Sequence, residues 1–224
     1  MPAILFDLDG VLIDSESLKA RAHAATVADL GGEVDPLYYG TVMGRDHAAV
    51  RAAFLRKGSI TATANDDYSA RYRSHYETLV DVELVATPGA LALLESLASS
   101  REYKLALVTS SQRWMVDRVF ERVPLAAHFD LIVTADDVDR HKPYPDAYVL
   151  ATKRLDTRAN RVVIFEDSGA GVTAAVDSGA SVVAVRHPFN RMHDFTGVSK
   201  IIQSLAPPSA TIALIKQLLD DTAK

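Results

Sequence analysis

The chain has 224 residues, of which 48% are hydrophobic and 24% are charged. This is the composition of an ordinary globular chain, which excludes disorder as the dominant state, and the length fits one large domain or a core with an insert. The formal net charge of -5, with no basic stripe along the chain, argues against nucleic acid as a partner.

The sequence contains no cysteine, so disulfides, thiolate metal sites and cysteine nucleophiles are all excluded. No apolar run approaches the ~18 residues of a membrane span, and the first apolar stretch is too short for the core of a signal peptide. We therefore expect a cytoplasmic protein without a membrane partner, as a monomer or a weak homodimer. Its chemistry must come from oxygen and nitrogen groups.

Short apolar runs recur along the chain and read as buried strands. They lie at 3–6, 105–108, 131–133, 162–165 and 181–185. The segments between the later runs have helical periodicity, for example Val116, Val119 and Phe120 on one face. Strands that alternate with helices predict an α/β fold with a doubly wound parallel sheet, whose ligands bind beyond the carboxyl ends of the strands.

Between Asp14 and about Val85 the alternation stops and only helical patterns appear. Their apolar faces are Leu18, Ala22 and Ala25; Val50, Ala53 and Phe54; and Tyr68, Tyr72 and Leu79. This predicts an all-helical insert at 15–85, placed after the first strand of a core formed by 1–14 and 86–224. Thr87-Pro88-Gly89 is expected to restart the core, with a helix that begins at the proline.

Two carboxylates, Asp7 and Asp9, follow the first strand two residues apart, and a period of two points both to the same side. Gly10 allows the backbone to turn away sharply, so that the pair faces a cavity. The alternative, chance acids in a solvated loop or a helix cap, fits one aspartate well and two aligned ones poorly. Asp14-Ser15-Glu16 comes next and could be more of the same site, but we prefer to interpret it as the N-cap and acidic first turn of the insert's first helix.

The run at 162–165 also ends in acids, Glu166 and Asp167, followed by glycines that open a helix. Adjacent carboxylates repel each other, so a hard cation between the two acidic clusters would explain them. Oxygen ligands without His or Cys favour Mg²⁺ over zinc. A dinucleotide loop is a weak alternative, because the G-x-G-x-x-G spacing is absent.

Two further strand ends carry polar groups. Thr109-Ser110-Ser111 precedes a helix that starts near Arg113, where hydroxyls and free amides can seat a phosphate oxygen. Capping of that helix by Ser110 or Ser111 is the alternative. Lys142, held between prolines and the preceding strand, is placed to bring an ammonium over the acids; taken alone it would be a surface lysine.

Together these segments resemble the four motifs of the haloacid dehalogenase superfamily, over nearly the whole chain. Asp7-Leu8-Asp9-Gly10 matches the first motif, Thr109 the second, Lys142 the third and Glu166-Asp167 the fourth. The resemblance extends to the subgroup with a helical cap after the first motif, which contains sugar-phosphate phosphatases and beta-phosphoglucomutase.

The resemblance implies a role for each of these residues. Asp7 would attack phosphorus and carry an aspartyl-phosphate, and Asp9 would act as general acid and then base. Mg²⁺ would be held by Asp7, the Asp9 carbonyl and Asp167, with help from Glu166. The substrate, a small phosphomonoester, would be held by Thr109 and Lys142 together with Gly10 and Ser110. We expect Asp7 to be ionised at neutral pH, as a free aspartate is, and a bound cation would lower its pKa further.

The second acid, Asp9, argues against dehalogenation, because a departing halide needs no proton. Beta-phosphoglucomutases carry a histidine where this chain has Lys19, and an arginine in a segment from which Met43-Gly44-Arg45-Asp46 departs. Both differences favour a phosphatase over a mutase. Lys19, Arg45 and His47 are candidates for contacting the organic part of the substrate, although solvated helix positions are expected for each, and His23 is expected to face elsewhere. A catalytically silent binding module is the alternative from a different class.

Overall fold

The computed structural model describes residues 1–61 and 65–222, in which six parallel strands form one sheet in the order β3-β2-β1-β4-β5-β6. The strands are β1 (Ala3–Phe6), β2 (Lys104–Val108), β3 (Leu131–Val133), β4 (Val162–Glu166), β5 (Ser181–Val185) and β6 (Lys200–Ile202). The five expected apolar runs are all strands of this sheet, so the α/β prediction is confirmed. The short edge strand β6 was not expected.

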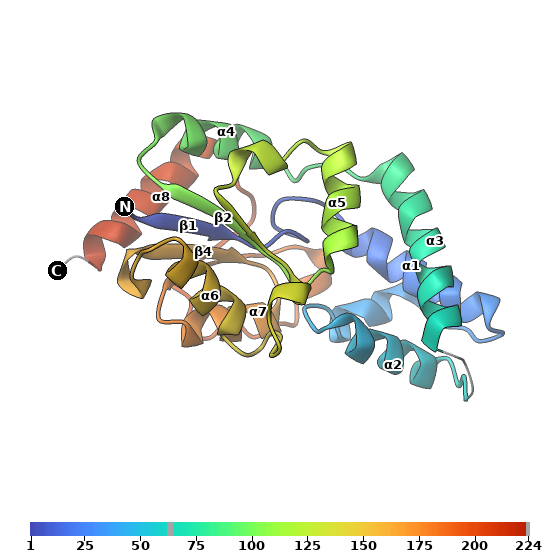
Figure 1. The fold of residues 1–224 in the computed structure, drawn as a ribbon. Coiled ribbons are helices and arrows are strands. Elements are labelled where there is room, and N and C mark those ends of the chain that lie inside the picture. The colour runs from blue at the N-terminus through green and yellow to red at the C-terminus, as the bar shows by residue number, and fades with distance from the viewer. Residues whose placement is uncertain (62–64, 223–224) are drawn as a thin grey trace.

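Alternate residues of each buried strand pack on opposite faces of the sheet. Ile4 and Phe6 of β1 belong to the core that also contains the inner faces of α4 (Ala90–Ser100), α5 (Arg113–Arg122) and α8 (Pro208–Asp221). Ala3 and Leu5 belong to a second core, shared with α6 (Asp146–Arg154) and α7 (Gly169–Asp177). Figure 1 shows these helices above and below the sheet. Burial on both faces is why the strands read as continuous apolar runs.

The chain between the first two strands is helical, as predicted, in the residues that the structure describes. It contains α1 (Glu16–Asp29), α2 (His47–Lys57), α3 (Asn65–Glu83) and the 3₁₀ helix η1 (Pro36–Thr41). These helices lie beyond the carboxyl ends of the strands (Figure 1). Further 3₁₀ turns in the rest of the chain are η2 (Ala126–His128), η3 (Ala135–Asp137), η4 (Ala159–Arg161) and η5 (Pro188–Asn190).

The helical insert leaves and rejoins the sheet region at adjacent points. The Asp14 amide donates to the Val85 carbonyl at 3.0 Å, and the Thr87 amide donates to the Leu12 carbonyl at 3.0 Å. The Thr87 hydroxyl donates to Val11 O at 2.5 Å. Helix α4 begins at Ala90 after Gly89, whose φ is 89°, so the expectation that it begins at Pro88 is wrong by two residues. Thr87 ties the two connecting segments together instead of capping the helix.

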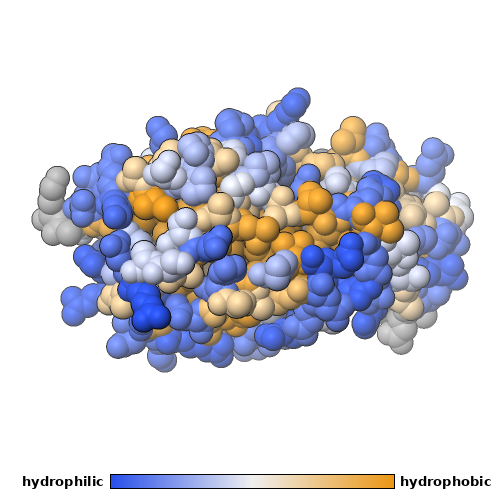
Figure 2. Space-filling model, turned by 90° about the horizontal axis from the view of Figure 1, so that it is seen from above, coloured by the Kyte–Doolittle hydropathy of each residue, from blue (hydrophilic) through white to orange (hydrophobic). Residues whose placement is uncertain are grey.

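The surface carries an apolar band on one side. Seen from above, hydrophobic residues lie in a band across the face that carries α4, between hydrophilic margins (Figure 2). Leu91 on α4 is one of the exposed large hydrophobic side chains. Within residues 1–61 and 65–222, no helix has the length and apolar character that crossing a membrane requires.

Candidate active site

Asp7 and Asp9 lie directly after β1, and each is only 6% exposed. The Asp7 amide donates to the Phe165 carbonyl of β4 at 2.9 Å, which fixes the start of this loop against the neighbouring strand. Gly10 has a φ of +74°, and a Cβ there would overlap the carboxylate of Asp167. The turn therefore requires glycine, both for its backbone angle and for the close approach of Asp167.

Gly10 does not line the cavity that contains the two aspartates. It lines a neighbouring cavity of about 270 Å³, between the start of the insert and η5. The structure therefore does not support the prediction that Gly10 touches the substrate. Its place against Asp167 gives it a shaping role instead.

Lys142 is inserted between two carboxylates from different strands. Its Nζ lies 2.6 Å from Asp7 Oδ1 and 2.6 Å from Glu166 Oε1, and only 2% of its side chain is exposed. It also donates to the carbonyl of Val108 at 3.2 Å. The expected placement of an ammonium over the acids is therefore what the structure shows, and Lys142 is not a surface lysine.

Both oxygens of Glu166 are used within the protein. Oε1 accepts from Lys142 and from the Tyr148 hydroxyl at 2.9 Å. Oε2 accepts from the backbone amides of Asp167 at 2.8 Å and Ser168 at 2.9 Å. Glu166 is thus placed to hold Lys142 and the loop after β4, and its position argues against the predicted direct contact with a metal.

Burial raises the pKa of Asp7 to about 7, with Lys142 opposing this shift and Glu166 and Asp9 adding to it. This differs from the expectation that Asp7 ionises like a free aspartate, because the side chain has lost its contact with water. Asp167 is likewise buried, and its pKa is raised well above the usual range by desolvation and by the charges of Glu166, Asp7 and Asp9. Asp7, Glu166 and Asp167 therefore bring three carboxyl groups together, whereas Lys142 supplies one positive charge.

Asp9 is held by three donors. Lys19 Nζ lies 2.6 Å from Asp9 Oδ2. The hydroxyls of Ser15 and Ser111 donate to Asp9 at 2.5 Å and 2.7 Å. Burial alone would raise the pKa of Asp9, but Lys19 and the two hydroxyls outweigh it and lower the pKa. Asp9 is therefore ionised in this arrangement.

The interpretation of Asp14-Ser15-Glu16 as the N-cap and acidic first turn of α1 is right in position, but Ser15 and Glu16 also belong to the site. Ser15 occupies the N-cap position of α1, yet its side chain makes no capping hydrogen bond and donates to Asp9 instead. Glu16 is 4% exposed and lines the cavity. Only Asp14 is exposed to solvent.

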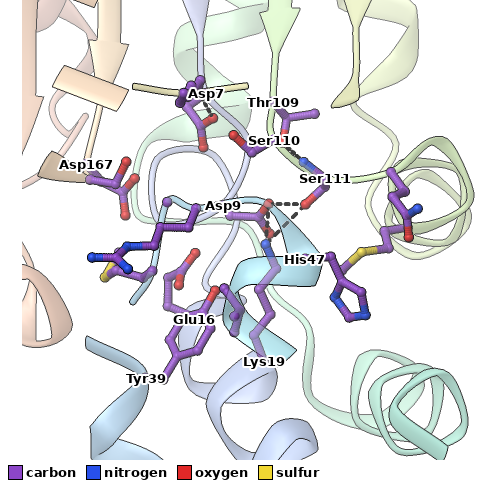
Figure 3. Close-up of a pocket in the computed structure, with 18 of the residues that line it drawn as sticks. Asp7, Asp9, Glu16, Lys19, Tyr39, His47, Thr109, Ser110, Ser111 and Asp167 are labelled. Carbon is purple, nitrogen blue, oxygen red and sulfur yellow. Dashed lines mark hydrogen bonds and ion pairs between the residues drawn. The ribbon is translucent and has the colours of Figure 1, made fainter. Parts of the chain in front are cut away.

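The hydroxyl cluster after β2 faces the cavity and does not cap α5. Gln112 is the N-cap residue of that helix. The Thr109 Oγ1 accepts from the Ser111 amide at 3.0 Å, which leaves the Thr109 hydroxyl proton available to a ligand. Thr109 and Ser110 line the cavity beside Asp7, as expected, while Ser111 is directed to Asp9 and Lys19 (Figure 3).

The helical insert closes this cavity from the opposite side. Together the two parts enclose about 50 Å³ lined by Asp7, Asp9, Thr109, Lys142 and Asp167 from the core and by Glu16, Lys19, Tyr39, Arg45 and His47 from the insert. Gly44 has a φ of +81°, and a Cβ there would overlap Ser168 after β4. Glycine at this position lets the loop before α2 approach the core closely. This space is small for a sugar phosphate, so we expect a substrate to enter with the insert displaced.

The insert residues differ from their expected solvated state. Lys19 is 8% exposed and His23 is 2% exposed, so the solvated position expected for Lys19 is wrong. His23 lines the cavity, contrary to expectation, and stacks on Tyr72 with ring centroids 4.2 Å apart. His47 is half-buried and its pKa falls to about 4, mainly through burial. Arg45 alone of these residues is exposed, at the rim of the cavity.

His187 is a residue that the sequence analysis missed. Its Nε2 forms a hydrogen bond of 2.7 Å with Asp167 Oδ2. It comes two residues after β5, so the rule that ligands bind beyond strand ends would have pointed to it. The hydroxyl of Ser111 was expected to seat a phosphate oxygen or to cap a helix, and its contact with Asp9 was not expected.

The donor chemistry at the core side fits a hard divalent cation. Asp7 and Asp167 supply carboxylates whose pKa values are raised by burial and by the charges of Glu166 and Asp9, and the Asp9 carbonyl is a further oxygen donor. Yet no three His, Asp or Glu side chains among residues 1–61 and 65–222 are arranged as a ready metal site. The reason is visible in the contacts: Asp7 turns to Lys142, Asp9 to Lys19 and Asp167 to His187.

Comparison with known proteins agrees with this geometry. A family of haloacid dehalogenase-like hydrolases matches residues 4–185. The chain is 29% identical over 221 residues to a phosphorylated carbohydrates phosphatase of Thermotoga maritima, covering 98% of this chain and 100% of the relative. It is 31% identical to a validoxylamine A 7'-phosphate phosphatase of Streptomyces hygroscopicus, over 81% of this chain and 84% of the relative.

A crystal structure of CbbY from Rhodobacter sphaeroides in complex with phosphate is similar in fold. It superposes with a TM-score of 0.81 at 30% identity, covering 92% of this chain and 96% of that chain. The family match spans both the strand-end motifs and the helical insert between them. The chain therefore belongs to the haloacid dehalogenase-like hydrolase family and is an enzyme of the phosphatase type.

Proposed function

We propose that the protein is a Mg²⁺-dependent phosphatase that hydrolyses a small phosphomonoester, such as a sugar phosphate, through an aspartyl-phosphate on Asp7. The observation that carries this proposal is the placement of Asp7, which lines a cavity together with Thr109 and has the Lys142 ammonium 2.6 Å from its carboxylate. A phosphate in this cavity has the donors of Lys142 and Thr109 available to its oxygens. The named phosphatases among its relatives support the same reaction class.

In this mechanism Asp7 attacks phosphorus while Lys142 and Thr109 bind the phosphoryl oxygens, with the Ser110 backbone and hydroxyl beside them. Lys142 is fixed by Glu166, so its charge is in place before the substrate arrives. A divalent cation held by Asp7, Asp167 and the Asp9 carbonyl would neutralise the charge that builds up on the phosphate and would keep Asp7 ionised.

Asp9 takes a proton from the water that hydrolyses the intermediate and gives a proton to the leaving group in the first step. The pairing with Lys19 favours the ionised form, which is the form needed to accept a proton. The donating step needs the protonated form. Lys19 therefore has to move from Asp9 before the first step, and its place on α1 links that movement to the opening of the insert.

We also propose the division into a core of residues 1–14 and 86–224 and a cap of residues 15–85. The two connecting segments pair with each other, and the insert covers the cavity from the side opposite the sheet. The cytoplasmic location and the monomeric or weakly dimeric state stay predictions.

The test is the release of phosphate from a panel of sugar phosphates, phosphoglycolate and p-nitrophenyl phosphate, with Mg²⁺ and with EDTA. We expect turnover that requires the metal, and a phosphorylated protein that is stable to acid and labile to hydroxylamine. Absence of turnover on every substrate would favour the silent binding module.

The mutase alternative is tested separately. Incubation with beta-glucose 1-phosphate and a trace of the bisphosphate is expected to yield glucose and phosphate. Formation of glucose 6-phosphate would instead favour the mutase. The phosphatase is preferred because Lys19 is occupied by Asp9 and Arg45 stands exposed at the rim, so neither is set to hold a second phosphate.

A further inference from the structure

Glu16 presents a buried carboxyl oxygen that has no partner. The residue is 4% exposed, and its Oε2 makes no hydrogen bond in the structure. The Tyr39 hydroxyl lies beside the same carboxyl group (Figure 3). In Figure 3 the carboxyl group points from α1 into the space between Asp9 and Asp167. A buried polar atom without a partner is unfavourable, so a group that binds there gains a favourable contact.

The other polar groups on the insert side are already occupied or neutral. Lys19 is engaged by Asp9 at 2.6 Å and by Ser111 at 3.1 Å. His23 Nδ1 is 2.8 Å from the Tyr68 hydroxyl. His47 is neutral at physiological pH because burial lowers its pKa to about 4. The insert therefore offers no free positive charge inside the cavity, and Arg45 lies outside at the rim.

The remaining lining on this side is apolar or aromatic. Met43, Val50, Tyr72 and Met115 line the same cavity. Such surfaces pack well against the C–H faces of a carbohydrate or polyol, while hydroxyl groups pair with the few polar atoms. A hydroxyl both donates and accepts, so it suits Glu16 in either protonation state. A carboxylate in the same place cannot donate a hydrogen bond to Glu16, and it would lie close to the acids Asp9 and Asp167.

We propose that Glu16 is a specificity-determining residue that binds a hydroxyl group of the leaving alcohol, so that the enzyme takes phosphate monoesters of neutral polyhydroxylated compounds and discriminates against esters with a carboxylate near the ester oxygen. The proposal rests on the phosphatase function. It assigns to the first residue of α1 a contact with the substrate's organic part that is independent of the reacting phosphate.

Glycerol 3-phosphate and 3-phosphoglycerate are matched probes, because they differ chiefly in a CH₂OH group against a carboxylate. p-Nitrophenyl phosphate, which has no aliphatic hydroxyl, reports on the chemical step alone. For the wild-type enzyme with saturating Mg²⁺ we expect kcat/KM for glycerol 3-phosphate to exceed that for 3-phosphoglycerate at least tenfold. A ratio near one or below would overturn the proposal.

Two substitutions separate the contact from other roles. In Glu16→Leu we expect kcat/KM for glycerol 3-phosphate to fall about ten times further than that for p-nitrophenyl phosphate, and mainly through KM. In Glu16→Gln, whose amide also donates and accepts, we expect glycerol 3-phosphate to stay within about threefold and 3-phosphoglycerate to improve. Glu33→Leu, the same change at an exposed glutamate of the insert, is the matched control.

Three outcomes would contradict the assignment. An equal loss on all three substrates in both Glu16 variants would mean that Glu16 supports the fold or the chemistry. A shift of more than threefold in the Mg²⁺ concentration for half-maximal activity would mean that its free oxygen serves the metal. Retention of the glycerol 3-phosphate preference in Glu16→Leu would place the specificity elsewhere. Failure of the phosphatase proposal looks different, since the wild-type enzyme would then hydrolyse none of the probes.

Discussion

The two sides of the cavity are built from different kinds of groups. The core side carries buried charges locked by several contacts each, as when Lys142 joins Asp7 to Glu166. The insert side carries neutral or already paired groups, such as Glu16, His47 and the Asp9-bound Lys19. Charge that must act on phosphorus has to be fixed in advance, whereas selection of a leaving group needs only complementary contacts. We therefore expect substitutions on the core side to abolish the reaction and those on the insert side to redirect it.

The largest effect should follow from Asp7→Asn, which removes the nucleophile and keeps its size. We expect kcat to fall roughly 10⁴-fold or more on every substrate, with the fold unchanged by circular dichroism. Asp14→Asn, the same change at an exposed aspartate, should leave kcat within twofold. Substantial activity in Asp7→Asn would show that the core side does not supply the nucleophile through Asp7.

Lys142→Met should affect both activity and stability. It leaves Asp7 and Glu166 buried without their ammonium. We therefore expect the free energy of unfolding, measured with denaturant in EDTA, to fall by about 3–5 kcal/mol. We expect kcat to fall on the order of 10²- to 10³-fold, because the loss includes a fixed positive charge at the phosphate. Lys153→Met, at an exposed lysine of α6, should change neither. An unchanged unfolding midpoint would contradict the buried ion-pair arrangement.

Much of the fold could be predicted because burial of a strand or helix determines which positions along its sequence are apolar. Strands covered on both faces read as apolar runs, and the apolar spacing of α1 to α3 marked the insert. Strand β6 has no such pattern, since Lys200 and Ile201 at the sheet edge are exposed. Backbone hydrogen bonds pair it with β5, and these bonds leave no pattern of apolar residues in the sequence.

The core half of the site could be predicted for a similar reason. Acids after a buried strand are unusual, so Asp7, Asp9 and Asp167 stood out. Ser15 and Glu16 did not, because a serine and an acid at a helix start look the same whether they cap the helix or face a cavity. Lys19 resembles any helix lysine until its burial is known. The insert's contribution depends on how two segments meet in space, and spacing along the chain does not contain that.

The insert side can also be tested through the pH dependence of stability. Burial raises the folded-state pKa of Glu16 to about 8, above its usual value of 4.5. The folded protein therefore binds the proton more tightly, and this stabilisation is present at low pH and is lost as pH rises towards 8. Relative to Glu16→Gln, the wild type should lose on the order of a few kcal/mol of unfolding free energy between pH 5 and 8.

The measurement is chemical denaturation of both proteins in EDTA across that range, where titrations common to both cancel in the difference. Glu33→Gln should track the wild type at every pH, since that side chain is exposed. A difference between wild type and Glu16→Gln that does not change with pH would show that Glu16 is ionised throughout. That result would mean that the insert side, like the core side, carries a buried charge at the cavity.

The smallest effect is expected for Arg45→Gln at the rim. Its guanidinium is exposed and screened by water and salt, so we expect KM for neutral leaving groups to change less than about threefold, with kcat and stability unaffected. Arg56→Gln on the outer surface of α2 is the matched control. A tenfold or larger rise in KM would show that the insert recognises substrates through charge and not through neutral groups.

The paired connections at Asp14 and Val85 have a consequence for how such enzymes can diversify. Because the departing and returning chains are hydrogen-bonded to each other, the insert is covalently joined to the core at one place, while its other contacts, such as Arg118 with Asp81, are made by side chains. A helical segment of different sequence could replace this one at the junction without any change to the sequence that carries Asp7 and Asp9. New selectivities would then arise by transplanting one contiguous segment rather than by rebuilding the protein.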